Sequence, residues 1–387
     1  MATTTVVSGV QYSGIWNLSS QANAKAAGTW PSQPMPYLYS WGANDQGALG
    51  LGDTTNRSSP NQVGTLKTWS SQVGGRFHTL AVKTDGTLWS WGYNNYGQLG
   101  LSTYTNYSSP KQVGALTTWL SVGAGNYASF AVKTDGTIWS WGYNAFGQLG
   151  LGNTATRLSP VQVGALTDWL SVNGGAGHTL AVKTDGTLWS WGLNSNGQLG
   201  ISTAGNRSSP VQIGSLTTWS KIAPSSYASG AIKTDGTLWT WGDNYRGELL
   251  LNNVTEYNSP KQVGALTNWL RISGGEYFYA IIKTDGTLWA GGYNVNGNLG
   301  DGTTTTRSSP VQIGALTTWS QIATGAYHCL SIQTNGTLWS WGANNRGQLG
   351  LGNTTYKSSP NQVGALTSWS AIGGGTATTS SLGIASV

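Results

Sequence analysis

The sequence predicts an all-β chain that folds as a seven-bladed β-propeller, and three observations predict it. A Trp-Gly pair or its equivalent recurs every 50 residues, and each 50-residue unit contains four short strand candidates. The two ends of the repeat region are complementary pieces of one unit. A fixed period in this range is typical of propellers and solenoids, and four strands per period favour a propeller blade. The repeated pairs end at Gly42, Gly92, Gly142, Gly192, Gly242, Gly292 and Gly342.

The unit that begins at Trp119 shows the four strands in order. LSVGAG is the first strand, SFAVKT the second and TIWSWG the third, and the fourth follows a long Gly/Asn-rich loop and contains Ser159. The dipeptide Asp135-Gly136 separates the second and third strands, which predicts a tight type I′ hairpin. One unit carries Asn335-Gly336 instead, a pair that suits the same turn.

Tryptophan recurs at three places in the unit. Trp89 and Trp91 lie two residues apart, so a strand places both on one face, and Trp69 has an equivalent in every unit. These residues could form a light sensor, a sugar-binding ladder or the packing between blades. We expect packing, because each buried aromatic removes about 150–250 Å² from water. One unit has Gly291 where the others carry Trp, so we expect Gly291→Trp to fill a gap and raise Tm.

The termini of the repeat region predict how the ring closes. Repeat material begins at Tyr37 with YLYSWG, a third strand, and ends with TSSLGIASV, a second strand. Together they complete one blade, which leaves no open sheet edge at the ends of the array. The predicted domains are therefore a propeller at residues 37–387 and a separate N-terminal segment at residues 1–36.

Composition excludes several classes of function. Charged residues make up 8% of the chain, the formal charge is +6, and there is no run of Lys or Arg. We therefore expect no nucleic-acid partner. No apolar run approaches the roughly 18 residues of a membrane span, so we expect no membrane insertion. The first residues lack the charged and apolar regions of a signal peptide, and the single Cys329 excludes an internal disulfide.

The sequence offers no constellation of catalytic residues. His78, His178 and His328 occupy the same position in different units, where a hydrogen-bonded structural role is the expected one. Five of the ten aspartates belong to the repeated Asp-Gly turns, which accounts for them without catalysis. Cys329 follows His328 directly, and adjacent strand residues point to opposite faces, so this pair makes a poor nucleophile and base. We expect no enzyme, no cofactor and no metal.

The repeat resembles the regulator of chromosome condensation repeat over residues 37–387. The resemblance rests on His78-Thr79, the Asp-Gly turn, Trp91-Gly92, Asn94 and Gly97-Gln98-Leu99-Gly100. It implies a seven-bladed propeller.

Members of the resembled family differ in what they do. The namesake exchanges nucleotide on the GTPase Ran with insertions and a basic tail, which a strict 50-residue period does not accommodate. Plant ultraviolet-B receptors carry Gly-Trp-Arg-His-Thr where this chain has Arg76-Phe77-His78-Thr79, without Trp, which argues against light sensing. A bacterial β-lactamase inhibitory protein uses the ring as a binding surface.

Differences between repeats predict a recognition face. In an up-and-down blade, the loops after strands one and three share one face, and the loops after strands two and four share the other. The second set is nearly constant, whereas the first varies in Tyr, Arg, Phe and Asn, residue types that carry interface energy. The predicted binding residues are Arg57, Arg76, Phe77, Tyr96, Tyr107, Tyr127, Phe146, Arg157, Arg207, Tyr227, Tyr245, Arg246, Tyr257, Tyr277, Arg307, Tyr327, Arg346 and Lys357.

The N-terminal segment predicts an attachment element. SSQANAKAAG could form a short helix capped by Asn17 or Ser19 and ended by Gly28, and Trp16 and Trp30 flank it. Residues 12–31 resemble a segment of structural proteins of tailed bacteriophages, which implies attachment to other virion proteins. Packing of the segment on the propeller as a lid is the alternative.

The sequence therefore favours a non-catalytic virion component, a tail fibre or surface decoration protein assembled in the host cytoplasm. Its variable rim would meet a host surface glycan or protein. A bacterial protein–protein module or inhibitor that uses the same face is the alternative.

Overall fold

The computed structural model describes residues 5–7, 10–12 and 36–386 of the chain. Strands β1 (Thr5–Val7) and β2 (Val10–Tyr12) pair in antiparallel fashion in an N-terminal unit, and the residues from Pro36 onward form a second unit. The predicted short helix, Trp16 and Trp30 lie outside the described residues. Among the residues described, the structure contains no helix that is both long and apolar enough to cross a bilayer.

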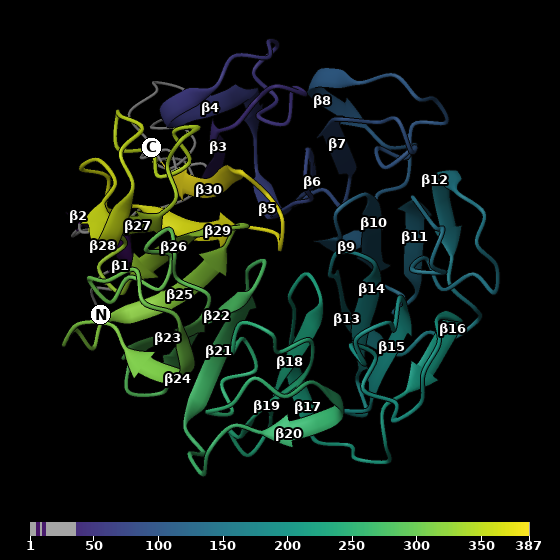
Figure 1. The fold of residues 1–387 in the computed structure, drawn as a ribbon. Helices are drawn as coiled ribbons and strands as arrows, with labels where there is room; N and C mark the ends of the chain where they lie inside the picture. The colour runs from purple at the N-terminus through teal and green to yellow at the C-terminus, as the bar shows by residue number, and fades with distance from the viewer. Residues whose placement is uncertain (1–4, 8–9, 13–35, 387) are drawn as a thin grey trace, which may run out of the picture. The chain divides into compact units, whose positions relative to one another are not determined.

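The second unit is a seven-bladed β-propeller of four-stranded antiparallel sheets, which confirms the predicted fold (Figure 1). Each blade runs from a first strand, which contacts its counterparts in the neighbouring blades, to an outer fourth strand. The first strands are β5 (Trp69–Gly74), β9 (Trp119–Ala124), β13 (Trp169–Gly174), β17 (Trp219–Pro224), β21 (Trp269–Gly274), β25 (Trp319–Thr324) and β29 (Trp369–Gly373). The second strands are β6 (His78–Lys83), β10 (Ala128–Lys133), β14 (His178–Lys183), β18 (Ala228–Lys233), β22 (Phe278–Lys283), β26 (His328–Gln333) and β30 (Ser380–Ser386).

The third and fourth strands complete the blades. The third strands are β7 (Leu88–Gly92), β11 (Ile138–Gly142), β15 (Leu188–Gly192), β19 (Leu238–Gly242), β23 (Leu288–Gly292), β27 (Leu338–Gly342) and β3 (Pro36–Gly42). The fourth strands are β8 (Tyr107–Gln112), β12 (Arg157–Gln162), β16 (Arg207–Gln212), β20 (Tyr257–Gln262), β24 (Arg307–Gln312), β28 (Lys357–Gln362) and β4 (Arg57–Lys67). We number the blades from the closing blade 1 (β29, β30, β3, β4) through blade 2 (β5–β8) to blade 7 (β25–β28).

Blade 1 joins the two ends of the propeller, as predicted. Its strand order is β29-β30-β3-β4. The C-terminal strand β30 therefore pairs with β3, the strand with which the propeller begins in the sequence. The register runs without a break from Pro36 opposite Ser386 to Gly42 opposite Ser380. Pairing between the termini leaves neither of these strands as an open edge.

The Asp-Gly turns lie between strands two and three, but the predicted turn type is wrong. A type I′ turn needs a positive φ at both central residues, whereas in Asp85-Gly86 only Gly86 is left-handed (φ +76°). Gly86 N–H donates to the Lys83 carbonyl, and the Lys83 and Thr87 backbones are paired. These bonds describe a type I turn followed by a left-handed glycine. The Asp85 carboxylate accepts from the amide and hydroxyl of Thr87, which favours this arrangement.

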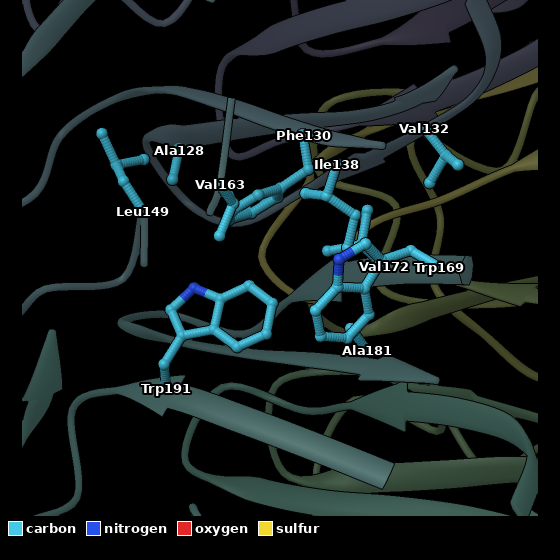
Figure 2. Packing of buried hydrophobic residues seen from close by; sticks show 10 residues of the cluster. All are labelled: Ala128, Phe130, Val132, Ile138, Leu149, Val163, Trp169, Val172, Ala181 and Trp191. Carbon is cyan, nitrogen blue, oxygen red and sulfur yellow. The ribbon is translucent and has the colours of Figure 1, made fainter. Parts of the chain in front are cut away.

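The tryptophans pack between neighbouring blades, as expected. Trp191 of blade 4 lies against Phe130, Ile138 and Val163 of blade 3 in one buried cluster (Figure 2). Its indole N–H donates to the Gln148 carbonyl of blade 3 at 2.8 Å. The same bond from one blade to the preceding one recurs at Trp41, Trp91, Trp141, Trp241 and Trp341.

The space at Gly291 is already occupied, which corrects the expectation of a gap. At the other boundaries a left-handed glycine lies against the indole, as Gly100 does against Trp141. At the boundary of blades 5 and 6 the glycine is replaced by Leu250, still left-handed (φ +63°). A Cβ added to Gly291 would meet the Leu250 Cδ2 at 2.5 Å. The two differences from the repeat therefore compensate for each other.

Candidate binding face

The loops after strands one and three meet on one face of the propeller, which we call the variable face. In blade 2 the Tyr93 N–H donates to the Phe77 carbonyl at 2.9 Å, and Arg76 N–H donates to Asn126 of blade 3. Asn94 closes the long loop, since its side chain accepts from Leu99 N–H and donates to the Thr103 carbonyl. Loops tied in this way need little ordering when a partner binds.

Six half-buried aromatic side chains form a continuous cluster on this face across blades 2 and 3. Tyr96 is central, with its ring centroid 5.2 Å from that of Tyr127 and 4.9 Å from that of Tyr143. The Arg76 guanidinium lies 5.3 Å from the centre of the Phe77 ring. The members of this first aromatic cluster are Phe77, Tyr93, Tyr96, Tyr127, Tyr143 and Phe146.

A second aromatic cluster lies on the same face across blades 5, 6 and 7. Tyr227 stacks on Tyr277 with centroids 6.0 Å apart, and Tyr293 links Tyr277 to Tyr327. Arg246 lies over the rings of Tyr277 and Tyr293, at 4.8 and 4.4 Å. Arg246 contacts the next blade as Tyr96 does in the first cluster. Burial raises the pKa of Tyr277 to about 12, so its hydroxyl stays protonated at neutral pH.

The other predicted binding residues do not join these clusters. Seven of them stand at the start of the outer fourth strands: Arg57, Tyr107, Arg157, Arg207, Tyr257, Arg307 and Lys357. Arg57 pairs with Asp53 and Arg307 with Asp301, while Arg346 pairs with Asp45. Tyr245 is 80% exposed on the variable face.

Tyr93, Tyr143 and Tyr293 belong to the clusters but are not among the predicted binding residues. Each follows the Trp-Gly pair or its equivalent directly. This position holds Ala43, Leu193, Asp243 and Ala343 in the remaining repeats, so its variability was visible in the sequence.

The histidines are buried between blades. His78 Nε2 lies 2.9 Å from the Ser129 hydroxyl of the next blade, and His178 and His328 make the same contact with Ser229 and Ser381. Burial lowers the pKa of His78 and His178 to about 3, and that of His328 to about 4. All three are therefore neutral at pH 7.

Cys329, the single cysteine of the chain, is buried. Burial raises the pKa of the Cys329 thiol, which donates to the Asn298 carbonyl at 3.4 Å. Within residues 5–7, 10–12 and 36–386, no three His, Cys, Asp or Glu side chains gather in a way that could hold a metal ion.

Glu248 introduces a buried carboxyl group at the irregular boundary of blades 5 and 6. It is 1% exposed; one oxygen accepts from Arg246 N–H at 2.8 Å, and the other has no partner among the described residues. Burial, with a smaller contribution from Asp243, raises the pKa of Glu248 to about 7. Four repeats carry a glutamine at this position: Gln98, Gln148, Gln198 and Gln348.

We predict that Glu248 makes the propeller less stable as pH rises through about 7. The folded-state pKa is raised above its usual value, so the folded state binds the proton more tightly than the unfolded state. Glu248→Gln removes this titration and is expected to flatten the pH dependence. Urea unfolding of both proteins at about pH 5 and about pH 8 tests this. Equal losses of stability in the two proteins would contradict it.

The comparisons with known proteins agree with this architecture. The family model for the regulator of chromosome condensation (RCC1) repeat matches seven segments, residues 37–82, 85–132, 135–182, 185–232, 235–282, 285–332 and 335–382. A second model of the same repeat matches residues 119–148, 169–198 and 319–348. No curated protein sequence matches the chain.

Solved structures of the same fold come from human and yeast. Human WBSCR16 is 23% identical with a TM-score of 0.81, over 91% of this chain and 99% of that one. Prp20p from Saccharomyces cerevisiae is 21% identical with a TM-score of 0.81, over 92% of each chain. The yeast RCC1 (Prp20) bound to Kap60 is 20% identical with a TM-score of 0.80, over 91% of this chain and 89% of that one. At these identities the likeness shows the fold, and the seven matched repeats show that the chain belongs to the regulator of chromosome condensation (RCC1) repeat family.

Proposed function

We propose that this propeller is a non-catalytic protein-binding module and that its variable face is the contact surface. The observation that carries the proposal is the gathering of half-buried aromatic side chains into two clusters on that face. Tyrosine and arginine are enriched among residues that dominate binding energy. The repeated framework holds these side chains on hydrogen-bonded loops, so binding orders little additional chain.

The yeast structures that are similar to this chain support a protein as its partner. The yeast Prp20p structure is reported with its binding to Gsp1p and histones, and the same protein has been solved bound to Kap60. These partners belong to Prp20. They support the class of partner for this chain and leave its identity to experiment.

An affinity capture experiment tests the proposed function. The full-length chain is used as bait in a lysate of its source, beside a Tyr127→Ala, Tyr277→Ala variant that removes one ring from each cluster. We expect a protein that is retained by the wild type and lost by the variant, while the circular dichroism of the two baits agrees. Retention of the same proteins by both baits would contradict the proposal.

A finer proposal concerns the setting in which the propeller works. The resemblance of residues 12–31 to bacteriophage structural proteins supports a virion component in which residues 1–36 attach to other virion proteins. The variable face would then meet a host surface glycan or protein. The human and yeast structures give no support to a virion setting, so this finer proposal rests on the sequence.

Mass spectrometry of purified particles tests the virion proposal. We expect the full-length chain in the particle and a chain lacking residues 1–36 outside it. Absence of both from particles would contradict the virion setting and leave protein binding by the propeller intact.

A further inference from the structure

A polar pocket of about 390 Å³ lies between blades 4 and 5, at the outer rim of the variable face. One wall is the long loop of blade 4, residues 194–197, and the other is the start of β20 in blade 5, residues 256–259. The two walls are tied together, since Ser202 N–H donates to the Asn258 carbonyl at 2.9 Å. The volume falls within the range of small-molecule sites.

The pocket lies where the chain departs from its own repeat. Asn258 stands where five repeats carry serine and one carries leucine, and Glu256 is the only acidic residue at its position. The equivalents of Glu256 are Asn56, Asn106, Thr156, Asn206, Thr306 and Tyr356. The other blades fold without a glutamate and an asparagine at these positions. The pair therefore adds hydrogen-bonding groups that the fold does not require.

The blade 4 wall leaves the pocket open. At the boundary of blades 1 and 2 a hydrogen bond crosses the equivalent space, because Asn106 Nδ2 donates to Gln46 Oε1 at 3.3 Å. Blade 4 has the shorter Asn196 in place of Gln46, and Asn196 Oδ1 accepts from the Ser195 hydroxyl of its own loop at 2.7 Å. Asn258 and Glu256 therefore face an open space that a ligand can enter.

The charges of the pocket favour a neutral ligand. Glu256 and Lys261 supply one charge of each sign, so an anion would meet the carboxylate and a cation would meet the ammonium group. A carboxylate only accepts hydrogen bonds, an ammonium group only donates them, and the Asn258 amide does both. A hydroxyl group both donates and accepts, so hydroxyl groups can pair with all three side chains.

The remaining wall favours a sugar over a peptide. Tyr257 presents a half-buried aromatic ring to the pocket, with Lys261 Nζ 5.3 Å from the ring centre. An aromatic ring of this kind offers apolar surface to the C–H groups of a sugar. A peptide would bind this sheet edge by adding a strand to β20. Pro260 lies within β20 and removes a backbone donor from that edge.

We propose that this pocket binds a neutral saccharide unit. The sugar hydroxyls donate to the Glu256 carboxylate and accept from the Asn258 amide and the Lys261 ammonium group, while a C–H face packs on Tyr257. One pocket that is open to solvent holds a single unit weakly, with a Kd on the order of 1 mM. The pocket lies outside both aromatic clusters, so this inference does not depend on the proposed protein partner.

Saturation-transfer NMR of the full-length chain tests the saccharide site. The probes are glucose, galactose, mannose and N-acetylglucosamine, each at about 10 mM, roughly ten times the expected Kd. We expect at least one of them to receive saturation from the wild type. The Glu256→Asn, Asn258→Ser variant gives the pocket the residues of other repeats. It is expected to bind at least about tenfold more weakly, because it loses a charge-assisted acceptor.

Two matched controls are expected to bind the sugar as the wild type does. Thr306→Asn makes the equivalent change in blade 6. The Tyr127→Ala, Tyr277→Ala variant damages both aromatic clusters and leaves the pocket intact, so it separates this site from the proposed protein-binding surface. Should the double variant at the pocket fail to fold, Glu256→Gln alone replaces it, because it keeps the shape of the side chain and removes its charge.

Three results would overturn the saccharide site. The first is a wild-type chain to which none of the four sugars binds. The second is binding that is as strong in the pocket variant as in the wild type, or that is lost equally in the Thr306→Asn control. The third is tighter binding of the charged sugars glucuronate or glucosamine than of any neutral sugar, which would contradict the neutral ligand.

Discussion

Gly291→Trp is expected to destabilise the propeller, although it restores the residue that the other repeats carry. The added side chain would enter space held by Leu250, whose Cδ2 lies 2.5 Å from the position of a new Cβ. Overpacking a close-packed core costs about 1–3 kcal/mol, and an indole is large enough to reach the upper end of that range. Thermal unfolding of the variant should therefore show a lower Tm than that of the wild type.

Leu250→Gly combined with Gly291→Trp is expected to reverse the loss. The double variant restores the glycine that faces the indole at the other boundaries, and it removes a left-handed leucine. The new indole N–H can donate to the Glu248 carbonyl, as Trp191 does to Gln148. Leu250→Gly alone leaves a cavity and should also lower stability.

The double-mutant cycle is the control for this prediction. Neighbouring residues that share one space show a large interaction energy, and independent ones add. We expect each single change to be destabilising and the pair to be at least as stable as the wild type. Additive losses, or a Gly291→Trp variant with a raised Tm, would contradict the assignment of Leu250 as the filling residue.

Changing Tyr96, Phe146 and Arg246 together to Ala is expected to abolish partner binding while the fold survives. Tyr96 contacts Tyr127 and Tyr143, and Arg246 lies over the rings of the second cluster, so the triple variant disrupts both. Each hot-spot residue is worth about 2 kcal/mol or more, so the Kd should rise at least about 100-fold. All three side chains lie on loops outside the strands, so Tm should change little.

A matched variant on the opposite face separates recognition from general damage. Thr117, Thr167 and Thr217 are exposed in the segments that join one blade to the next, and changing all three to Ala should leave the Kd unchanged. Calorimetry with the captured partner measures both variants. Equal loss of affinity in the two would show that the variable face has no special part in binding.

The sequence predicted the architecture well because the repeats of this one chain can be aligned with each other without a gap. A period of 50 residues and complementary ends fixed the number of blades and the closing strand pairs. The type of the Asp-Gly turn was missed because it depends on the φ of Asp85, which the bonds from Thr87 to its carboxylate favour in the right-handed region. The Asp-Gly dipeptide alone does not determine the φ of its aspartate, and therefore does not determine the turn type.

The compensation between Leu250 and Gly291 was missed for a different reason. The two residues are far apart in sequence and meet only because the long loop of one blade packs on the third strand of the next. Each departure from the repeat was visible in the sequence, as GELL in place of GQLG and as Gly in place of Trp. Their contact needed the structure.

The members of the two aromatic clusters were predicted in part, and their role in binding stays a prediction. Divergence between repeats identified Tyr96, Tyr127 and Arg246, which lie in the clusters, but it treated the arginines of the fourth strands as members of the same surface. Those arginines are the first residues of the outermost strands. Arg57 forms a salt bridge with Asp53, and Arg307 forms one with Asp301. Variability between repeats predicted the face on which a residue lies. It did not predict how far that residue lies from the centre of the ring, which depends on its strand within the blade.

Hydroxyl-radical footprinting of the propeller, free and bound to its captured partner, tests the central claim most directly. Binding through the variable face predicts that the partner protects Tyr96, Tyr127 and Tyr277 from oxidation. It also predicts unchanged oxidation on the opposite face, where Leu216 and Leu266 are exposed in the segments that join the blades. Protection of Leu216 and Leu266 by the partner, with Tyr96, Tyr127 and Tyr277 oxidised as in the free protein, would contradict it.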